Sequence, residues 1–384
     1  MSWRTTCPMN ERARFMLDLE TGLYSVTELC QRYSVCRKTA YKWIGRYHEG
    51  GLSVLDDRPR TPTRCPHRLP DDVATALLQC RRDHPTWGPR KLVAYLARRH
   101  PETAWPAPST VGDLLKREGL VQARRRRTKH AHPGKPHVAP MGPNDVWAAD
   151  FKGEFKTLDG LYCYPLTVTD LASRFLLACV ALPSTGRLEA QPVFEKLFQI
   201  YGLPNQILTD NGPPFASTRA IGGLSQLAVS WLKLGIQPVR IEPGRPDQNG
   251  KHERMHRTLK AEATKPPKAN LDLQQQEFDR FRRVFNQERP HDALDSDTPA
   301  MRYVVADRRD VWEVPPVRYP AHFVVRKVSG NSGFRWKSRF VFVSRTLMGE
   351  DVGLEEADDG IWSVWFRDFL IGRFNEQDPK RKVL

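Results

Sequence analysis

The chain has 384 residues, of which 40% are hydrophobic and 27% are charged, a composition typical of a globular protein with two or three domains. No apolar run approaches the roughly 18–20 residues that span a bilayer, and the N-terminus lacks the apolar segment of a signal peptide. We therefore expect a cytoplasmic protein. Seven cysteines, an odd number without a Cys-x-x-Cys pair, argue against a disulfide framework and a cysteine-based zinc site.

The net charge of +16 is concentrated in the N-terminal part of the chain. Residues 1–140 contain 26 Lys or Arg and 13 Asp or Glu, a net charge of +13. Residues 141–384 contain 34 and 31, a net charge of +3. A basic region of this kind is typical of a protein that binds a polyanion, and nucleic acid is the commonest such partner.

Residues 1–50 have the pattern of a helix-turn-helix domain. A short helix is expected over 26–33, and a second helix over about 37–47 follows a turn at Ser34 and Val35. In this motif the second helix enters the major groove of DNA. Its expected buried residues are Val35, Ala40, Trp43 and Ile44. Its expected DNA contacts are Arg37, Lys38, Tyr41, Lys42 and Arg46. The alternative is a helical hairpin with a solvated basic face.

A Pro- and Arg-rich linker over 51–69 leads to a second helix-turn-helix domain over 70–122. Its helices are expected at about 71–82, 89–99 and 109–118. Ser109 and Thr110, at the start of the third helix, are a second candidate point of entry into a DNA groove.

A basic linker over 123–142 follows the second domain. Its run of four arginines is expected to lie along DNA phosphates, which adds affinity without sequence choice. These residues are Arg124, Arg125, Arg126 and Arg127. The alternative is a localisation signal or a solvated run of charge.

Residues 143–306 have the order of elements of a mixed α/β domain. Three consecutive strands, a helix over about 188–201, a further strand and later helices predict a mixed sheet flanked by helices. Asp150 and Asp210 each close an apolar run that is expected to be a strand. Glu253 lies in the first turn of an expected helix, and Arg257 and Lys260 follow on the same face at i+4 and i+7.

Three acids at these positions can converge although they are distant in sequence. Carboxylates brought together repel one another unless cations lie between them, which indicates hard divalent ions with oxygen ligands. Two such ions can clamp the attacking and the leaving oxygen of a phosphodiester. For Glu253 alone, the simpler interpretation is a solvated helix with an i,i+4 pair to Arg257. Asp170 is a competing carboxylate that more simply caps the turn at 171–173.

Blocks of this region resemble the signature blocks of a known family. WAADFKG, LTDNGPPFAS, GRPDQNGKHERMHRTLKAE and NQERPHDALDSDTPA resemble insertion-sequence DNA transposases with a retroviral-integrase-like, RNase H-fold core. The resemblance spans 144–303. It implies that Asp150, Asp210 and Glu253 are the catalytic acids and the ligands of two Mg²⁺ ions, with Mn²⁺ tolerated. It also implies that Arg257 and Lys260 hold the terminal base pairs. Glu253 follows Asp210 by 43 positions, more than is common in the family, which implies an insertion at 217–223.

From about Val314 the pattern changes to short alternating strands joined by Gly, Asn and Asp turns. It predicts a small five-stranded barrel over 310–384, which resembles the SH3-like barrel of integrases and related transposases. Arg335, Lys337 and Arg339 are expected to share one face of a strand. The alternative is a structural or protein-binding module, because this half of the chain is almost neutral.

The sequence as a whole predicts a multidomain DNA transposase with all-α helix-turn-helix modules, an α/β RNase H-like core and a small all-β barrel. It would bind the terminal inverted repeats of an insertion sequence, cleave the DNA ends by two-metal hydrolysis and join the 3′-hydroxyl ends to target DNA. We expect a homodimer or higher oligomer on double-stranded DNA in a bacterial nucleoid. Two other classes remain open: a DNA-binding regulator with an inactive integrase-like core, and a nuclease of RNase H type.

Overall fold

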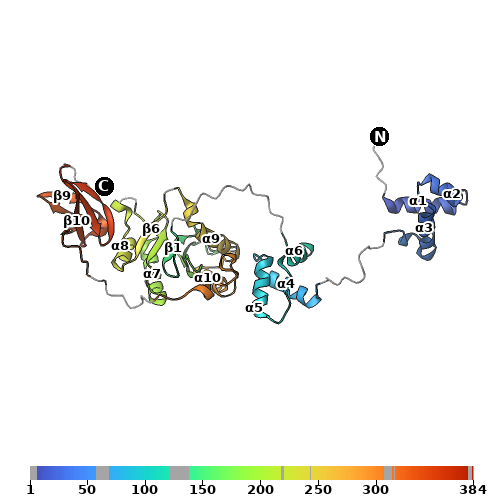
Figure 1. Ribbon diagram of the computed structural model, residues 1–384, viewed down its shortest axis with the longest axis horizontal. Helices are drawn as coiled ribbons and strands as arrows, with labels where there is room; N and C mark the ends of the chain where they lie inside the picture. The colour runs from blue at the N-terminus through green and yellow to red at the C-terminus, as the bar shows by residue number, and fades with distance from the viewer. Residues whose placement is uncertain are drawn as a thin grey trace. The chain divides into compact units, whose positions relative to one another are not determined.

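The structure is a computed structural model that describes residues 7–57, 69–121, 138–217, 220–242, 244–306, 314, 316–378 and 383. The predicted linker contacts Arg124, Arg125, Arg126 and Arg127 lie outside these residues. The chain divides into two compact units, Met1–Arg68 and Leu69–Leu384 (Figure 1). Within the described ranges, no helix has both the length and the apolar character needed to cross a membrane.

The first unit is a three-helix domain around a small apolar core. It consists of α1 (Pro8–Glu20), α2 (Val26–Arg32), α3 (Arg37–Gly50) and a 3-10 turn, η1 (Gly51–Val54). The α2 helix begins after Ser25, whose side chain accepts a hydrogen bond from Glu28 N while the Glu28 carboxylate accepts one from Ser25 N. The buried core side chains include Phe15, Met16, Leu29, Ala40, Trp43 and Leu55. The predicted helix-turn-helix fold is confirmed here.

The second unit begins with three helices that match the predicted ones to within two residues: α4 (Asp71–Asp83), α5 (Pro89–Arg99) and α6 (Pro108–Arg117). Trp87 is fully buried at their centre, stacked on His84 and edge-on to Tyr95. The α5 helix also contacts the following domain, because Lys91 Nζ donates a hydrogen bond to Pro290 O at 2.6 Å. These three helices therefore form part of the same compact unit as the sheet that follows.

The centre of the second unit is a mixed sheet. Its strands are β1 (Val146–Phe151), β2 (Phe155–Lys156), β3 (Tyr162–Asp170), β4 (Leu176–Leu182), β5 (Gln206–Thr209) and β6 (Gln237–Arg240). β3 pairs antiparallel with β1, β2 and β4, whereas β1, β5 and β6 run parallel. This is the predicted RNase H-like arrangement.

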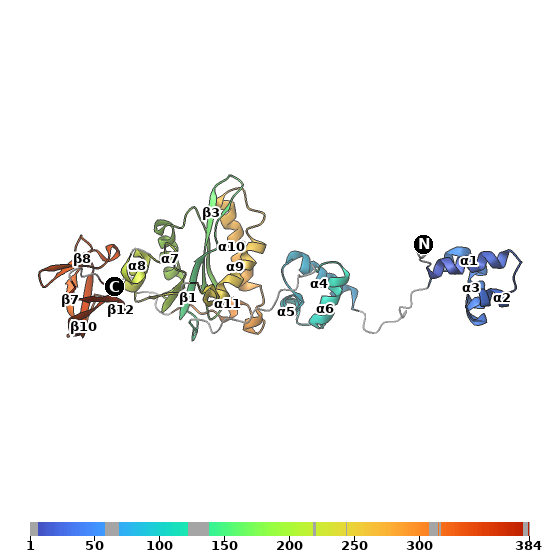
Figure 2. The ribbon, with the colours of Figure 1, turned by 90° about the horizontal axis from the view of Figure 1, so that it is seen from above.

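Helices cover both faces of this sheet (Figure 2). On one side lie α7 (Arg187–Tyr201) and α8 (Gln226–Lys233), and on the other lie α9 (Gly250–Glu262) and α10 (Leu271–Gln287). A short helix, α11 (Pro299–Arg302), follows α10. Side chains alternate between the faces of a strand, so Trp147 and Ala149 pack toward α7. The even-numbered side chains of β1, which include Asp150, therefore point to the face that α9 covers.

The C-terminal part is all-β, as predicted, but has six strands rather than five. β7 (Val324–Lys327), β10 (Asp351–Asp358), β11 (Ile361–Phe366) and β12 (Phe369–Asn375) form a four-stranded antiparallel sheet, in the order β12-β11-β10-β7. β8 (Gly333–Trp336) and β9 (Arg339–Phe342) form a separate hairpin. Among the described residues, no strand pairing closes these two sheets into a barrel.

The prediction that Arg335, Lys337 and Arg339 share one strand is wrong. Lys337 and Ser338 adopt positive φ angles of 43° and 64° and reverse the chain between β8 and β9. Two consecutive residues of this conformation form the tight turn that suits the twist of a hairpin. Arg335 and Arg339 consequently lie on different strands.

A 3-10 turn, η2 (Ile221–Gly223), and α8 hold the C-terminal sheets against the core. Leu224, Ala228 and Leu232 belong to the same buried cluster as the C-terminal strands. Gly222 has φ +66°, and a Cβ there would lie 2.9 Å from Ile371 O, so glycine permits this close approach. This segment, where we placed the insertion that the family resemblance implies, contacts the C-terminal sheets.

Candidate active site

Asp150 and Asp210 lie beside each other at one edge of the central sheet. Asp150 is the last residue but one of β1, and Asp210 directly follows β5. The two strands are parallel, and Ala148 is paired with Leu208. Each acid is therefore two residues beyond a paired position, so both side chains project from the same face of adjacent strands. The Asp210 carboxylate also accepts a hydrogen bond from Gly212 N at 3.1 Å.

Glu253 approaches this edge from α9. It is exposed in the first turn of the helix. Burial raises the pKa of Asp150 to about 7, and the negative charges of Asp210 and, more weakly, of Glu253 contribute to the rise. The three candidate acids therefore lie within electrostatic reach of one another. We call Asp150, Asp210 and Glu253 the acid cluster.

A buried polar network between β1, β3 and α9 packs behind Asp150. Thr167, which is paired with Asp150 across β1 and β3, donates a hydrogen bond from Oγ1 to Asp150 O at 3.0 Å. Thr167 Oγ1 also lies 2.8 Å from His252 Nε2 and 2.6 Å from His256 Nε2. Thr169 Oγ1 lies 2.8 Å from His252 Nδ1. The network therefore joins β1, β3 and α9 behind the carboxylates.

The Thr167 hydroxyl has a single proton, and this determines which atoms of the network are donors and which are acceptors. Since Thr167 donates that proton to Asp150 O, both imidazole Nε2 atoms must donate to Thr167, and His252 Nδ1 accepts from Thr169. Burial lowers the pKa of His252 to about 3 and that of His256 to about 2, so both rings are neutral at pH 7. His256 Nδ1 is then an unprotonated nitrogen, 3.7 Å from Asp150 Oδ2.

Two sets of side chains near Asp150 could bind a metal ion. The first is the acid cluster, whose oxygen donors and mutual repulsion fit a hard divalent cation. The second is Asp150 with His252 and His256, whose candidate ligand atoms lie within 4.8 Å of one another. Both nitrogens of His252 and one nitrogen of His256 are already hydrogen-bonded to threonines, so the second set offers one free nitrogen. The acid cluster offers three carboxylates, the ligand type that a hard divalent cation prefers, but its three groups do not all lie within 4.8 Å of one another as those of the second set do.

The outer face of α9 carries the other candidate residues of this site. Arg257 and Lys260 are exposed, as Glu253 is, whereas His252, Met255, His256 and Leu259 are buried. No hydrogen bond or ion pair to another described residue involves the side chain of Arg257 or Lys260. This open face therefore presents one carboxylate and two cations to solvent.

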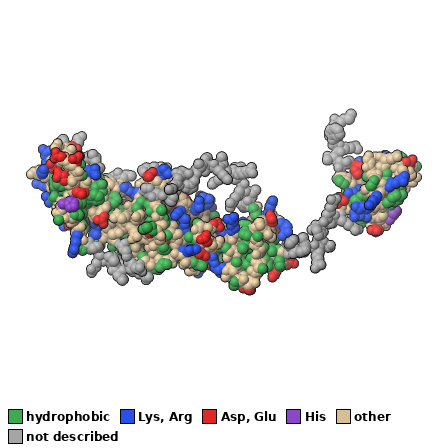
Figure 3. Space-filling model, viewed as in Figure 1, with side chains coloured by type: hydrophobic (Ala, Val, Ile, Leu, Met, Phe, Trp, Pro, Cys, Tyr) green, Lys and Arg blue, Asp and Glu red, His purple; other side chains and the backbone are tan. Residues whose placement is uncertain are grey.

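The candidate DNA contacts of the helical domains are mostly at the surface. Arg37, Lys38, Tyr41 and Lys42 are exposed along α3. Arg46 is half-buried because its guanidinium stacks on Trp43, 4.7 Å from the ring centre. Ser109 and Thr110 are exposed in the first turn of α6. Figure 3 shows Lys and Arg side chains at the surface of both units.

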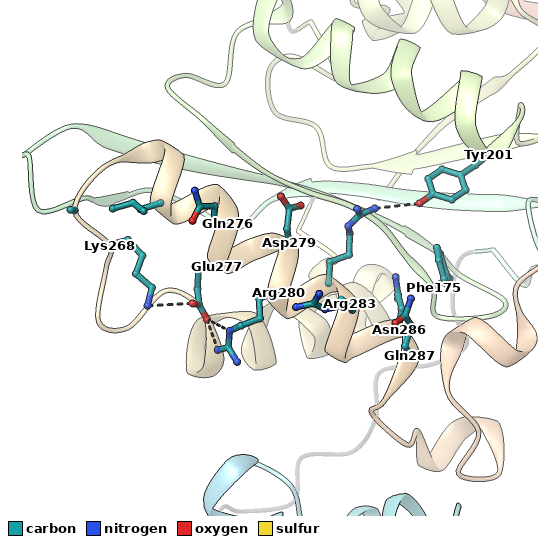
Figure 4. Close-up of a pocket in the computed structure, with 13 residues that line it drawn as sticks. Phe175, Tyr201, Lys268, Gln276, Glu277, Asp279, Arg280, Arg283, Asn286 and Gln287 are labelled. Carbon is teal, nitrogen blue, oxygen red and sulfur yellow. Dashed lines mark hydrogen bonds and ion pairs between the residues drawn. The ribbon is translucent and has the colours of Figure 1, made fainter. Parts of the chain in front are cut away.

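A cavity of about 870 Å³ lies along α10 (Figure 4). Three of its charged side chains are paired with one another. The Glu277 carboxylate forms an ion pair with Lys268 at 3.3 Å and accepts a hydrogen bond from Arg280 Nε at 3.0 Å. Asp150, Asp210 and Glu253 do not line it. Its lining mixes four basic side chains with two acidic ones.

Sequence reasoning missed His256, Thr167 and Thr169. The available signal was the spacing of His252 and His256, which are four residues apart and therefore share one face of α9. Asn211, which follows Asp210, makes a structural contact, since its side-chain amide donates to Ile241 O at 2.8 Å. Asp170 likewise caps the 171–173 turn, because its carboxylate accepts a hydrogen bond from Ser173 N at 2.7 Å.

Four family models match successive parts of the chain. A helix-turn-helix domain matches residues 11–63, and a homeodomain-like domain matches residues 39–115. Two models of the integrase core domain match residues 140–246 and 234–299. The chain carries helix-turn-helix domains joined to an integrase core. The predicted resemblance is confirmed at this level.

Curated relatives match about a third of the chain. The Pol polyprotein of feline endogenous virus ECE1 and the Gag-Pol polyprotein of baboon endogenous virus (strain M7) are each 34% identical over 123 residues, or 32% of this chain. The Pol polyprotein of radiation murine leukemia virus (strain Kaplan) is 32% identical over 123 residues. The chain spans only 11%, 7% and 20% of these three relatives, respectively.

Solved structures with some likeness also come from retroviruses. The HTLV-2 integrase catalytic core domain in complex with magnesium has a TM-score of 0.35 at 18% identity, covering 43% of this chain and 100% of that one. A simian T-cell lymphotropic virus intasome in complex with the PP2A regulatory subunit B56 gamma has a TM-score of 0.38 at 17% identity, covering 72% and 97%.

Proposed function

We propose that this protein is a DNA transposase that binds the ends of an insertion sequence, cleaves them and joins the 3′-hydroxyl ends to target DNA. The observation that supports this most strongly is the acid cluster, in which burial and, to a smaller extent, the charges of Asp210 and Glu253 raise the pKa of half-buried Asp150. Three mutually repelling carboxylates destabilise a fold unless a cation binds between them. Such an arrangement suits metal-dependent phosphodiester chemistry on an integrase core.

Asp150, Asp210 and Glu253 would hold two Mg²⁺ ions, with Mn²⁺ as a substitute. The bound metal would supply positive charge that lowers the pKa of the attacking water or hydroxyl and stabilises the leaving oxygen. The neutral network of Thr167, His252 and His256 would keep the Asp150 backbone in place. The nucleophile is water or a DNA 3′-hydroxyl, so no side chain needs to form a covalent bond with DNA.

The DNA would be held by three groups of side chains. Arg257 and Lys260 would grip the terminal base pairs beside Glu253. The exposed residues of α3 (Arg37, Lys38, Tyr41, Lys42 and Arg46) would read the major groove, and Ser109 and Thr110 would read a second one. Two ends must be cut in concert, so the working form would be a homodimer or higher oligomer on DNA.

A plasmid transposition assay with Glu253→Gln tests this function. The substitution keeps the size of the side chain but removes one negative charge from the acid cluster, so we expect a loss of about a thousandfold. Asp272→Asn, on the exposed start of α10, should retain wild-type activity. DNA binding by Glu253→Gln should also remain. Equal transposition by Glu253→Gln and wild type would refute the proposed triad, and DNA binding without any transposition by the wild type would favour a regulator.

A further inference from the structure

A cavity of about 300 Å³ beside α9 is lined by an unusual number of basic side chains. They are Lys91 from α5, Arg174 from the turn between β3 and β4, Lys251, Arg254 and Arg257 from α9, and Arg289 from the segment after α10. We call this the cation cavity. Four segments that are far apart in sequence thus bring positive charge to one place, and the residues of the acid cluster do not line it.

The two acids in the cation cavity offset only part of the charge of its six cations. Against the larger lowering by burial, the negative charge of Asp170 acts to raise the pKa of Arg174 and Lys251. The negative charge of Asp292 likewise acts to raise the pKa of Lys91. Asp170 is fully buried, and its carboxylate accepts hydrogen bonds from Asn144 N at 2.8 Å and Ser173 N at 2.7 Å. It is therefore committed to holding the backbone of the β3–β4 turn. Asp292 is exposed at the rim, and no ion pair with a described residue involves it.

Only two of the six cations have protein partners among the described residues. Arg289 forms an ion pair with Glu262 at 2.7 Å, and Lys91 Nζ donates to Pro290 O. The side chains of Arg174, Lys251, Arg254 and Arg257 make no hydrogen bond or ion pair with another described residue. In addition, His291 Nε2 is buried without a hydrogen-bond partner among these residues. The cavity therefore contains unused donors in a partly desolvated place.

Burial and mutual repulsion destabilise the charged forms of these side chains. Burial lowers the pKa of Arg174, and the positive charge of Arg254 lowers it further. Burial and the charge of Arg174 lower the pKa of Lys251. Burial and the charge of Arg289 lower the pKa of Lys91 to about 8. An anion in the cavity would relieve this repulsion, whereas a neutral ligand would not.

We propose that the cation cavity binds a phosphodiester group of the DNA backbone. Planar guanidinium groups match phosphate oxygens through paired hydrogen bonds, and three of the unpartnered cations are arginines. The volume suits one backbone phosphate with part of its sugar rather than a stacked base pair. The assignment of the phosphate to DNA rests on the proposed function, but binding of a phosphate group can be measured independently of it.

The cation cavity lies next to Glu253 along α9, so a phosphate bound there would help to position the DNA. Lys251, Arg254 and Arg257 lie within one turn of Glu253 on α9. A backbone phosphate held there would be fixed relative to the acid cluster through a single rigid helix. Lys91 reaches the same cavity from α5 of the second helical domain. The cavity would therefore set the register between the DNA held by that domain and the strand to be cleaved.

The test measures binding of the full-length protein to a fluorescent duplex about three helical turns long, in EDTA and at about 50 to 200 mM salt. Arg254→Gln and Arg174→Gln should each weaken binding about tenfold and reduce the salt slope by about 1, the effect of one lost phosphate contact. Arg254→Lys should restore part of the affinity. Arg283→Gln, an exposed arginine of α10 outside this cavity, is the matched control and should bind as the wild type does.

A second measurement separates DNA from free phosphate. Thermal unfolding is followed with and without inorganic phosphate for the wild type, Arg254→Gln and Arg283→Gln. If phosphate stabilises the wild type but not Arg254→Gln while the duplex affinities are equal, the cavity binds a free anion and the DNA assignment is wrong. If neither duplex affinity nor phosphate stabilisation changes in correctly folded Arg254→Gln and Arg174→Gln, the proposal is overturned. The assays contain no metal, so neither result depends on whether Glu253→Gln abolishes transposition.

Discussion

The acid cluster and the cation cavity both depend on α9, yet they carry opposite charges. In the acid cluster, burial and the charges of Asp210 and Glu253 raise the pKa of Asp150 to about 7. In the cation cavity, burial and neighbouring positive charge lower the pKa of Arg174 and Lys251. In both places the ionised form is the destabilised one. The ligand-free protein thus holds two groups of like charges that do not neutralise each other.

The buried side of α9 explains how such charges stay together. His252, Met255, His256 and Leu259 are buried against the sheet and α10, so the helix cannot rotate or move outward to separate its charged residues. Like charges held by a packed framework store unfavourable energy that a ligand of opposite charge releases on binding. The comparison therefore predicts that each site is stabilised by its own ligand and by neutral substitutions, and three experiments can break or sharpen it.

The largest expected effect is the pH dependence of Mg²⁺ binding at the acid cluster. Because a proton must leave Asp150 when a cation binds, the affinity should fall by up to about tenfold for each pH unit below 7, or about 50-fold between pH 7 and 5. Calorimetric titration of the full-length protein measures this. Glu253→Gln should weaken binding while keeping the slope, because Asp150 is the titrating group. Affinity that does not change with pH would show that Asp150 is not a ligand.

The next effect concerns the stability of the metal-free protein. The pKa of Asp150 rises from an ordinary 3.8 to about 7 on folding, so the folded state binds its proton more tightly. The resulting stability is fully present below about pH 3.8, falls as the pH rises and is lost above about 7. Asp150→Asn should remove this loss and raise the free energy of unfolding at pH 8 by about 2 kcal/mol in EDTA.

Denaturant unfolding of the wild type, Asp150→Asn and Asp272→Asn from pH 4 to 8 checks this prediction. The exposed control should follow the wild-type pH profile, whereas the profile of Asp150→Asn should be flatter. If Asp150→Asn is less stable than the wild type at pH 8, a hydrogen bond of the carboxylate outweighs the repulsion. In that case the ionised form of Asp150 would not be destabilised in the way that the cations of the cation cavity are.

Local sequence patterns predicted the helices and the positions of the acids well. The helices α4, α5 and α6 follow apolar periodicity and end signals, which act within one or two turns. Asp150 and Asp210 were expected at strand ends, and the parallel pairing of β1 with β5 places them side by side. This inference needs only the fold class, because adjacent parallel strands end at the same edge of a sheet.

Features that depend on several distant segments could not be predicted in this way. The network of Thr167, His252 and His256 requires the β1–β3 register and the docking of α9 on the sheet. The walls of the cation cavity come from four segments. A local error was also made at Lys337 and Ser338, where alternation suggested one strand but two positive φ angles form a turn without the usual Asn-Gly signal.

The smallest expected effect is at Lys251, the counterpart of Asp150 in the cation cavity. Its side chain is only half-buried, so solvent screens much of the repulsion from Arg174. Its place in the first turn of α9 is a further unfavourable feature, because a cation there opposes the helix dipole. Lys251→Gln should therefore increase the free energy of unfolding at pH 7 by less than about 1 kcal/mol in phosphate-free buffer of low salt.

A double-mutant cycle separates these two causes. If repulsion within the cation cavity matters, the gain from Lys251→Gln should shrink in an Arg174→Gln background and in inorganic phosphate. A gain that comes from the helix dipole alone would be the same in both backgrounds. Lys260→Gln, in the last turn of α9 and outside the cavity, removes a cation that suits the helix dipole and should therefore not increase the stability. If Lys251→Gln instead destabilises the protein, Lys251 contributes a favourable contact. Repulsion between like charges would then destabilise the acid cluster but not the cation cavity.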